Sequence, residues 1–120
     1  MTAATSDKRE LRPAECCPAI AGETLDERDA AATATLFKAL SDPHRLQIVN
    51  LLANAEDPVC VCDITRVVKL SQPTTSFHLA KLVRAGLLDR EQRGVWGYYS
   101  LNRRALERLG TVFATPGRKP

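Results

Sequence analysis

Residues Ser71–Gly86 read SQPTTSFHLAKLVRAG and carry the signature of a helix with one polar face. Ser71 is a favoured N-cap, Pro73 suits a first helical turn, and Gly86 is a common stop just beyond a helix end. Leu79 and Leu82 are spaced to point inward on one side. This stretch therefore predicts a helix that packs by a narrow apolar side and shows polar and basic side chains to solvent.

The segments on either side of this helix complete a recognisable order of elements. A short helix is predicted from about Cys62 to Val68, and only Lys69, Leu70 and Ser71 separate it from the polar-faced helix. After Gly86, two strand-like segments, 87–90 and 95–101, flank the turn 91–94 and predict a hairpin. The expected fold class is mainly α with a β-hairpin wing, a winged helix-turn-helix whose second helix enters the major groove of DNA.

Three further helices are predicted around this unit. Thr24 and Glu27 form a capping box for a helix from Leu25 to about Leu40, in which Ala30, Ala34, Phe37 and Leu40 share a face. A helix from Pro43 to about Ala53 follows, with Leu46, Val49 and Leu52 at helical spacing. Asn102 caps a last helix with a stripe of Leu106, Leu109 and Phe113. We expect a flexible N-terminal arm over 1–23, one DNA-binding and dimerisation domain over 24–114, and a basic tail over 115–120.

Composition and charge narrow the class of protein. The chain has 120 residues, 44% of them hydrophobic and 26% charged, which suits one globular domain. Apolar runs are too short to cross a membrane and the first residues, MTAATSDKRE, lack an apolar signal core, so we expect a cytoplasmic protein with no membrane partner. Residues 1–60 carry a net charge of −4 and residues 61–120 a net charge of +7, which predicts that the C-terminal half faces a polyanion.

The candidate DNA contacts lie on the polar-faced helix and the hairpin. Five side chains of the helix can exchange hydrogen bonds with base edges or phosphates, and two more supply positive charge. Two arginines would sit on the wing. The predicted set is Gln72, Thr74, Thr75, Ser76, His78, Lys81, Arg84, Arg90 and Arg93. Double-stranded DNA is therefore the expected partner.

The motifs LFKALSDPHRLQIVNLL, VCVCDIT, LSQPTTSFHLAKLVRAGLL and a hairpin ending in YYSL resemble the ArsR/SmtB family of metal- and metalloid-responsive repressors. The resemblance covers about Leu36 to Leu109. It implies a homodimeric winged-helix repressor whose first and last helices form the dimer interface. It also implies that the repressor binds a palindromic operator and is released when its inducer binds.

The resemblance further implies where the inducer binds. The arsenic- and cadmium/lead-sensing branches carry a Cys-Val-Cys-Asp motif, here residues 60–63, but the third cysteine that many arsenic sensors place on this helix is missing. Cys16 and Cys17 on the arm are the only other thiols and resemble the arm cysteines of other members. The Asp/His site of the zinc, cobalt and nickel sensors is absent, since residues 102–113 contain neither type. The candidate ligands are Cys16, Cys17, Cys60 and Cys62.

Three kinds of trigger remain open at this point. We favour As(III), or Sb(III), held by three thiolates from Cys16, Cys17 and either Cys60 or Cys62, because soft thiolates select soft ions and three of them neutralise a trivalent ion. Cd(II) or Pb(II) bound by all four cysteines is the first alternative. A thiol redox switch on the same fold is the second. No enzyme is expected, because no Cys-x-x-Cys opens a helix and no set of catalytic residues is visible, and no organic cofactor is expected.

Overall fold

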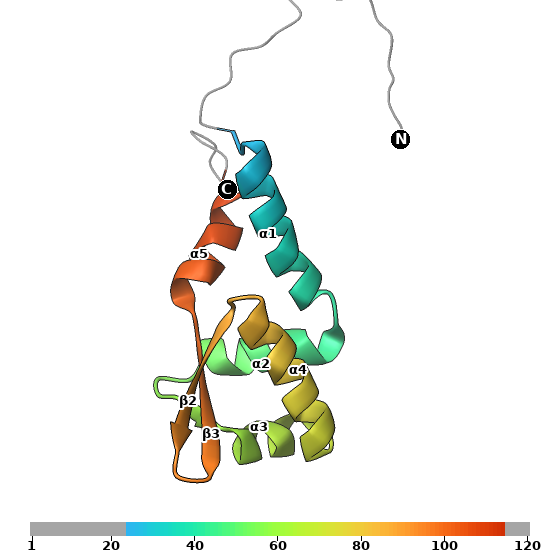
Figure 1. Cartoon of the computed structure of the whole chain (residues 1–120), viewed down its shortest axis with the longest axis vertical. Helices are drawn as coiled ribbons and strands as arrows, with labels where there is room; N and C mark the ends of the chain where they lie inside the picture. Colours follow the sequence, from blue (N-terminus) through green and yellow to red (C-terminus); the bar gives the residue numbers. More distant parts are fainter. Residues whose placement is uncertain (1–23, 115–120) are drawn as a thin grey trace, which may run out of the picture.

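The computed structural model of the chain describes residues 24–114, a helical body that carries a small antiparallel sheet (Figure 1). Within that range no helix is both long and apolar enough to cross a membrane. The winged helix-turn-helix order is as predicted. In chain order the elements are α1 (Glu27–Leu40), α2 (Pro43–Ala53), β1 (Val59–Cys60), α3 (Val61–Val68), α4 (Gln72–Arg84), β2 (Leu88–Arg93), β3 (Trp96–Leu101) and α5 (Arg103–Thr111).

The helix ends follow the capping residues in the sequence, with one correction. Asp42, Ser71 and Asn102 cap α2, α4 and α5 by accepting backbone N–H groups of the first turn. The predicted capping box of Thr24 and Glu27 is wrong. Asp26 is the N-cap of α1 and its Oδ1 accepts from the Asp29 N–H at 2.7 Å. A carboxylate at this position also interacts favourably with the helix dipole, so Asp26 is the stronger cap.

The sheet has one strand more than the predicted hairpin. Its strand order is β1-β3-β2, and the two residues of β1 pair with β3 as Val59↔Tyr99 and Cys60↔Tyr98. The turn is also tighter than expected, because β2 runs to Arg93 and pairs there with Trp96. A two-residue strand carries too little periodicity to be seen in the sequence.

The core lies where α2, α3, α4 and the sheet meet. Its fully buried side chains are Ile48, Ile64, Leu79, Leu82 and Leu87, each with no exposed surface. Leu46, one of the three apolar residues noted in the second helix, is instead 53% exposed, because the inward face of α2 is formed by Ile48, Val49 and Leu52. The core therefore fixes α3 and α4 against each other and against the wing.

The α1 and α5 helices lie together at the end opposite the hairpin tip (Figure 1). The buried residues of α1 are Thr33, Leu36 and Ala39, so the face with Ala30, Ala34 and Phe37 is outward. The rings of Phe37 and Phe113 contact each other in a tilted arrangement with centroids 5.8 Å apart, although Phe37 is 38% and Phe113 is 71% exposed. This exposed apolar surface suits the predicted role of the two helices in dimerisation, which stays a prediction.

The turn between α3 and α4 generates a prediction about stability. Lys69 is in the left-handed region, with φ 61° and ψ 42°, and its N–H closes α3 on the Thr65 carbonyl at 3.0 Å. A side chain in this region is strained by roughly 1–2 kcal/mol, part of which glycine recovers. We expect Lys69→Gly to stabilise the fold by about 0.5–1 kcal/mol in urea unfolding. Lys69→Ala keeps the strain and should give no such gain; equal stabilisation by both substitutions would contradict this explanation.

Candidate nucleic-acid interface and thiol pair

The turn that sets α4 against α3 is held by local hydrogen bonds. Ser71 Oγ accepts from the Thr74 N–H at 3.3 Å and also donates to Thr74 Oγ1 at 2.9 Å. The apolar side of α4, Leu79 and Leu82, is fully buried. One side of α4 is thus packed into the core, and its other side is exposed to solvent.

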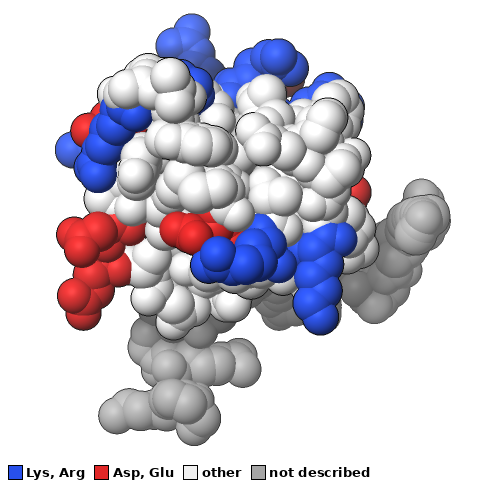
Figure 2. Space-filling view, turned by 90° about the horizontal axis from the view of Figure 1, so that it is seen from below, with Lys and Arg blue, Asp and Glu red and all other residues white. Residues whose placement is uncertain are grey.

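Most of the predicted contact residues lie on this open face. Five of the seven predicted for α4 are exposed, namely Gln72, Thr74, Ser76, Lys81 and Arg84. Viewed from below, uncharged residues cover much of this end of the molecule, with Lys and Arg at several places and Asp and Glu at the left edge and in the lower middle (Figure 2). On α4 itself, exposed uncharged side chains stand beside Lys81 and Arg84, which is suited to base contacts flanked by phosphate contacts.

Thr75 and His78 lie on the opposite side of α4, which corrects the expectation that they contact DNA. Thr75 has no exposed surface and its Oγ1 donates to the Ser71 carbonyl at 2.9 Å. His78 is 8% exposed and its Nδ1 accepts from Arg45 Nε at 3.2 Å. Helical spacing places Thr75 on the side of Leu79 and Leu82, whereas the burial of His78 depends on its packing against α2. Thr75 therefore closes the first turn of α4, and His78 joins α4 to α2.

Basic side chains of α1, α2 and α4 lie near one another. They line a hollow of about 280 Å³ together with Thr35, Ala39 and Ala85, and the basic members are Lys38, Arg45, Lys81 and Arg84. None of the described residues that line it is acidic. Lys38 and Arg45 were not predicted as contacts, since they lie on α1 and α2, outside the helix-turn-helix. Together the four cations could hold a phosphate group.

Both wing arginines are exposed but already partnered. Arg90 Nε donates to Tyr99 Oη at 3.1 Å and its Nη2 donates to Gln92 Oε1 at 2.6 Å. Arg93 forms an ion pair with Glu91, with Nε and Nη2 at 3.1 and 3.3 Å from the carboxylate oxygens, and its guanidinium lies 4.4 Å from the Tyr98 ring centroid. A phosphate contact by Arg93 therefore competes with the ion pair to Glu91.

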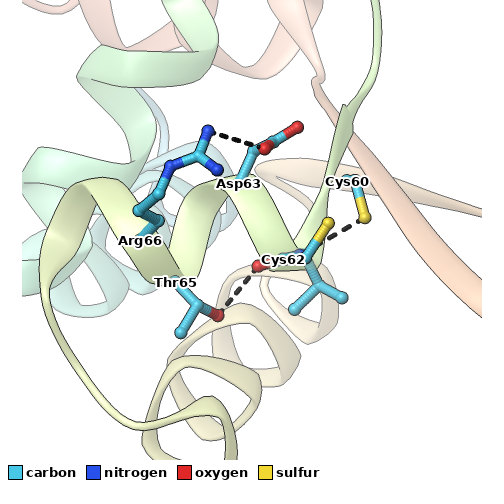
Figure 3. Close-up of polar contacts among 6 residues, drawn as sticks. Cys60, Cys62, Asp63, Thr65 and Arg66 are labelled. Atoms are coloured by element: carbon cyan, nitrogen blue, oxygen red, sulfur yellow. Dashed lines mark hydrogen bonds and ion pairs between the residues drawn. The ribbon is translucent and has the colours of Figure 1, made fainter.

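The thiols of Cys60 and Cys62 lie together at the first turn of α3 (Figure 3). Cys60 ends β1 and is the N-cap of α3, and its Sγ accepts from the Cys62 N–H at 3.3 Å. Cys60 is 6% exposed, whereas Cys62 is exposed. A hydrogen bond with the Cys60 side chain raises the pKa of the Cys62 thiol, and partial desolvation and the negative charge of Asp63 act in the same direction. Binding of a thiophilic ion by Cys62 must therefore displace a proton.

The remaining predicted ligands, Cys16 and Cys17, lie outside the described residues. Within residues 24–114, no group of three or more Cys, His, Asp or Glu is placed to hold a metal ion by itself. Cys60 and Cys62 supply two soft donors and fit a thiophilic ion, but they are an incomplete set for As(III), Cd(II) or Pb(II).

Known proteins resemble this chain both in sequence and in fold. Residues 42–90 match the family model of the bacterial regulatory proteins of the arsR family. The arsenical resistance operon repressor of Bacillus subtilis (strain 168) is 42% identical over 66 residues, which are 55% of this chain and 62% of that protein. The cadmium resistance transcriptional regulatory protein CadC of Listeria innocua serovar 6a is 42% identical over 71 residues, 59% of each chain. The chain thus spans about three-fifths of the length of these two relatives.

A third relative is matched over more of its length, and solved structures match the fold. The arsenical resistance operon repressor of Staphylococcus xylosus is 40% identical over 73 residues, 61% of this chain and 68% of that protein. HlyU from Vibrio cholerae N16961 is similar with a TM-score of 0.63 and 29% identity, over 72% of this chain and 90% of that one. The homodimeric winged helix-turn-helix DNA-binding domain Mb0332 from Mycobacterium bovis gives 0.60 and 29%, over 78% and 86%.

The ion pair between Glu91 and Arg93 on the wing predicts how the Glu91 carboxyl titrates. The hydrogen bond from Arg93 and its positive charge lower the pKa of the Glu91 carboxyl. The stabilisation that Glu91 contributes is therefore present above its unfolded pKa and is lost as the pH falls through the lower folded pKa. In an NMR titration we expect Glu91 to titrate below the usual range of Glu and to return to it in Arg93→Ala. An unchanged Glu91 titration in that variant would contradict the pairing in solution.

Proposed function

The chain belongs to the arsR family of bacterial regulatory proteins, and on that premise we propose that it is a transcriptional repressor that binds operator DNA as a homodimer and is released by a thiol-bound inducer. Residues 24–114 are the DNA-binding and dimerisation unit, and residues 1–23 are an arm that supplies ligands. DNA binding is supported by the exposed polar side chains of α4 and by the exposed Lys81 and Arg84 on the same helix. Dimerisation is supported by the exposed apolar face of α1 beside α5 and by the homodimeric domain from Mycobacterium bovis.

The proposal that the thiols control DNA binding rests on one observation, the position of Cys60. It ends the strand β1, which pairs with the wing strand β3 through Tyr98, and it caps α3, the helix that packs on α4. The side chain of Tyr98 lies against Arg93 on the same wing. A change at Cys60 or Cys62 is therefore transmitted over short contacts to both elements that face the DNA.

The inducer that suits this pair best is As(III), or Sb(III). Three thiolates neutralise a trivalent ion, and an ion that completes its three ligands from Cys16 and Cys17 needs one further sulfur from α3. Two of the relatives above are named as arsenical resistance repressors. When bound, the ion supplies a covalent cross-link between the arm and the first turn of α3.

The thiols of Cys60 and Cys62 have different roles in this proposal, because Cys60 is buried and Cys62 is exposed. Cys62 is exposed and can accept an arm-bound ion without a change in α3. The Cys60 sulfur is buried and holds the Cys62 N–H, so its use as a ligand requires the first turn of α3 to open. Cys62 is therefore the simpler third ligand, and recruitment of Cys60 would disturb the helix cap and β1 directly.

Release from DNA follows from pinning the arm to α3. The arm cross-link favours a position of α3 in which α4 and the wing no longer match the operator. To change operator occupancy from 99:1 to 1:99, the inducer must prefer the DNA-free conformation by about 5.5 kcal/mol. Several bonds to thiolates can supply this difference, so no second binding site is needed.

A second candidate trigger is Cd(II) or Pb(II) bound by all four cysteines. This alternative is favoured by the relative that is named as a cadmium resistance regulator. Four thiolates around a divalent ion would leave a charge of −2 beside α3 and α4. Oxidation of the exposed Cys62 is the remaining alternative. Challenging the reduced protein–operator complex separately with arsenite, antimonite, cadmium, lead, zinc and peroxide distinguishes these triggers.

The proposed phosphate contact of Lys81 predicts a change in the salt dependence of DNA affinity. Each phosphate contact contributes about one unit to the slope of log K against log salt. We expect Lys81→Ala to weaken binding to operator and unrelated duplexes alike and to reduce this slope by about one unit. Gln72→Ala is the matched control on the same face and should leave the slope unchanged. A slope that is unaffected by Lys81→Ala would remove Lys81 from the phosphate contacts.

The thiol site is tested by conservative serine substitutions. Cys60→Ser and Cys62→Ser should retain operator affinity within about threefold, because serine is itself a good N-cap and Cys62 is exposed. Arsenite should no longer release Cys16→Ser or Cys17→Ser, nor the variant of whichever α3 cysteine is the third ligand. Fluorescence anisotropy of a labelled operator measures both effects. Full release of all four variants by arsenite would refute the proposed site, and release of the wild type by zinc alone would refute the proposed inducer.

A further inference from the structure

An aromatic ring stands at the centre of the exposed face of α4. Phe77 is 53% exposed and lies opposite the buried stripe of Thr75, Leu79 and Leu82. Helical spacing places Ala80 beside it and Pro73 one turn before it, and both are exposed. Three exposed apolar residues therefore lie together on this side of the helix, and Lys81 and Arg84 follow on the same side toward its C-terminal end.

Neighbouring side chains hold the Phe77 ring in place without covering it. Lys81 Nζ lies 5.3 Å from the ring centroid. The His78 ring meets it edge to face, with centroids 5.6 Å apart and an interplanar angle of 69°. His78 is itself fixed by Arg45 Nε. Because the ring is already oriented, little rotational freedom remains to be lost when it meets a partner.

The surroundings of the ring indicate what that partner is. Gln72 and Ser76 on one side offer hydrogen bonds, and Lys81 and Arg84, one and two turns further along the helix, offer positive charge. A protein interface usually surrounds its apolar core with polar side chains of both charges. Here the apolar residues are accompanied by hydrogen-bond donors and positive charges only, which complements a polyanion that also presents apolar groups.

The floor of the DNA major groove has one apolar substituent, the C5-methyl group of thymine. We propose that Phe77, with Ala80 beside it, contacts thymine methyl groups and so determines part of the operator sequence. This inference rests on the proposed function, because it assumes that α4 enters the major groove. Gln72 and Ser76 would contact polar base edges beside the thymines, while Lys81 and Arg84 contact phosphates.

Removal of the methyl groups from the DNA tests the proposal without touching the protein. A duplex is first selected from a random pool by the reduced wild-type chain. Each thymine is then replaced in turn by deoxyuridine, which pairs identically but lacks the methyl group. At one or two positions in each half-site we expect the wild type to bind the deoxyuridine duplex about three- to tenfold more weakly.

The same duplexes with protein variants assign the effect to Phe77. Phe77→Ala should bind the thymine duplex about three- to tenfold more weakly and should no longer distinguish thymine from deoxyuridine at those positions. Val67→Ala is the matched control, because Val67 is also 53% exposed but lies on α3, and it should keep the wild-type discrimination. Equal thermal unfolding of Phe77→Ala and wild type would show that the fold is retained.

The outcomes separate the two proposals. If the wild type selects no duplex, the proposed function fails and this inference fails with it. If the wild type binds a selected duplex but no deoxyuridine position weakens it, only the methyl contact is wrong. Discrimination that persists in Phe77→Ala would likewise overturn the role of Phe77. Loss of self-association by Phe77→Ala, with unchanged DNA discrimination, would identify the ring as a contact between copies of the chain.

Discussion

The pairing of Cys60 with Tyr98 is the constraint on which the account of this protein depends. Through it, a two-residue strand joins the wing to the start of α3, and the same Cys60 side chain caps that helix. The α3 helix is in turn packed on α4 through a core whose largest side chains are fully buried. The two thiols therefore lie where the wing strand β3 meets the start of α3, so a change there acts on the wing and on the helix that packs against α4.

Much of this arrangement could be predicted from the sequence because its signals are local. Asp42, Ser71 and Asn102 cap their helices, and the order of the elements specifies the winged fold. The β1 strand could not be predicted, because two residues have no periodicity and its pairing with β3 is long-range. The first helix is capped by Asp26 rather than by Thr24, because two acceptable caps lie close together and the carboxylate both accepts the Asp29 N–H and interacts favourably with the helix dipole.

The candidate DNA contacts show the same division. Exposure of Gln72, Ser76, Lys81 and Arg84 follows from helical spacing once Leu79 and Leu82 are placed inward. The same spacing places Thr75, four residues before Leu79, on the inward side, whereas the burial of His78 depends on distant residues such as Arg45. Phe77, two residues from both Thr75 and Leu79, lies opposite the buried stripe and is exposed. The pairing of Arg93 with Glu91 follows from the strand β2, which runs to Arg93 and places these two side chains on one side.

The central claim is that a thiol-bound inducer and operator DNA favour different conformations of the same domain. Thermodynamic linkage makes this claim quantitative, because a ligand that weakens DNA binding by a given factor must itself bind the DNA complex more weakly by the same factor. The direct measurement is the affinity of arsenite for the reduced free protein and for its saturated operator complex. We predict that arsenite binds the operator complex more weakly, by the factor with which it lowers operator affinity. Equal arsenite affinity for the two forms would contradict the account.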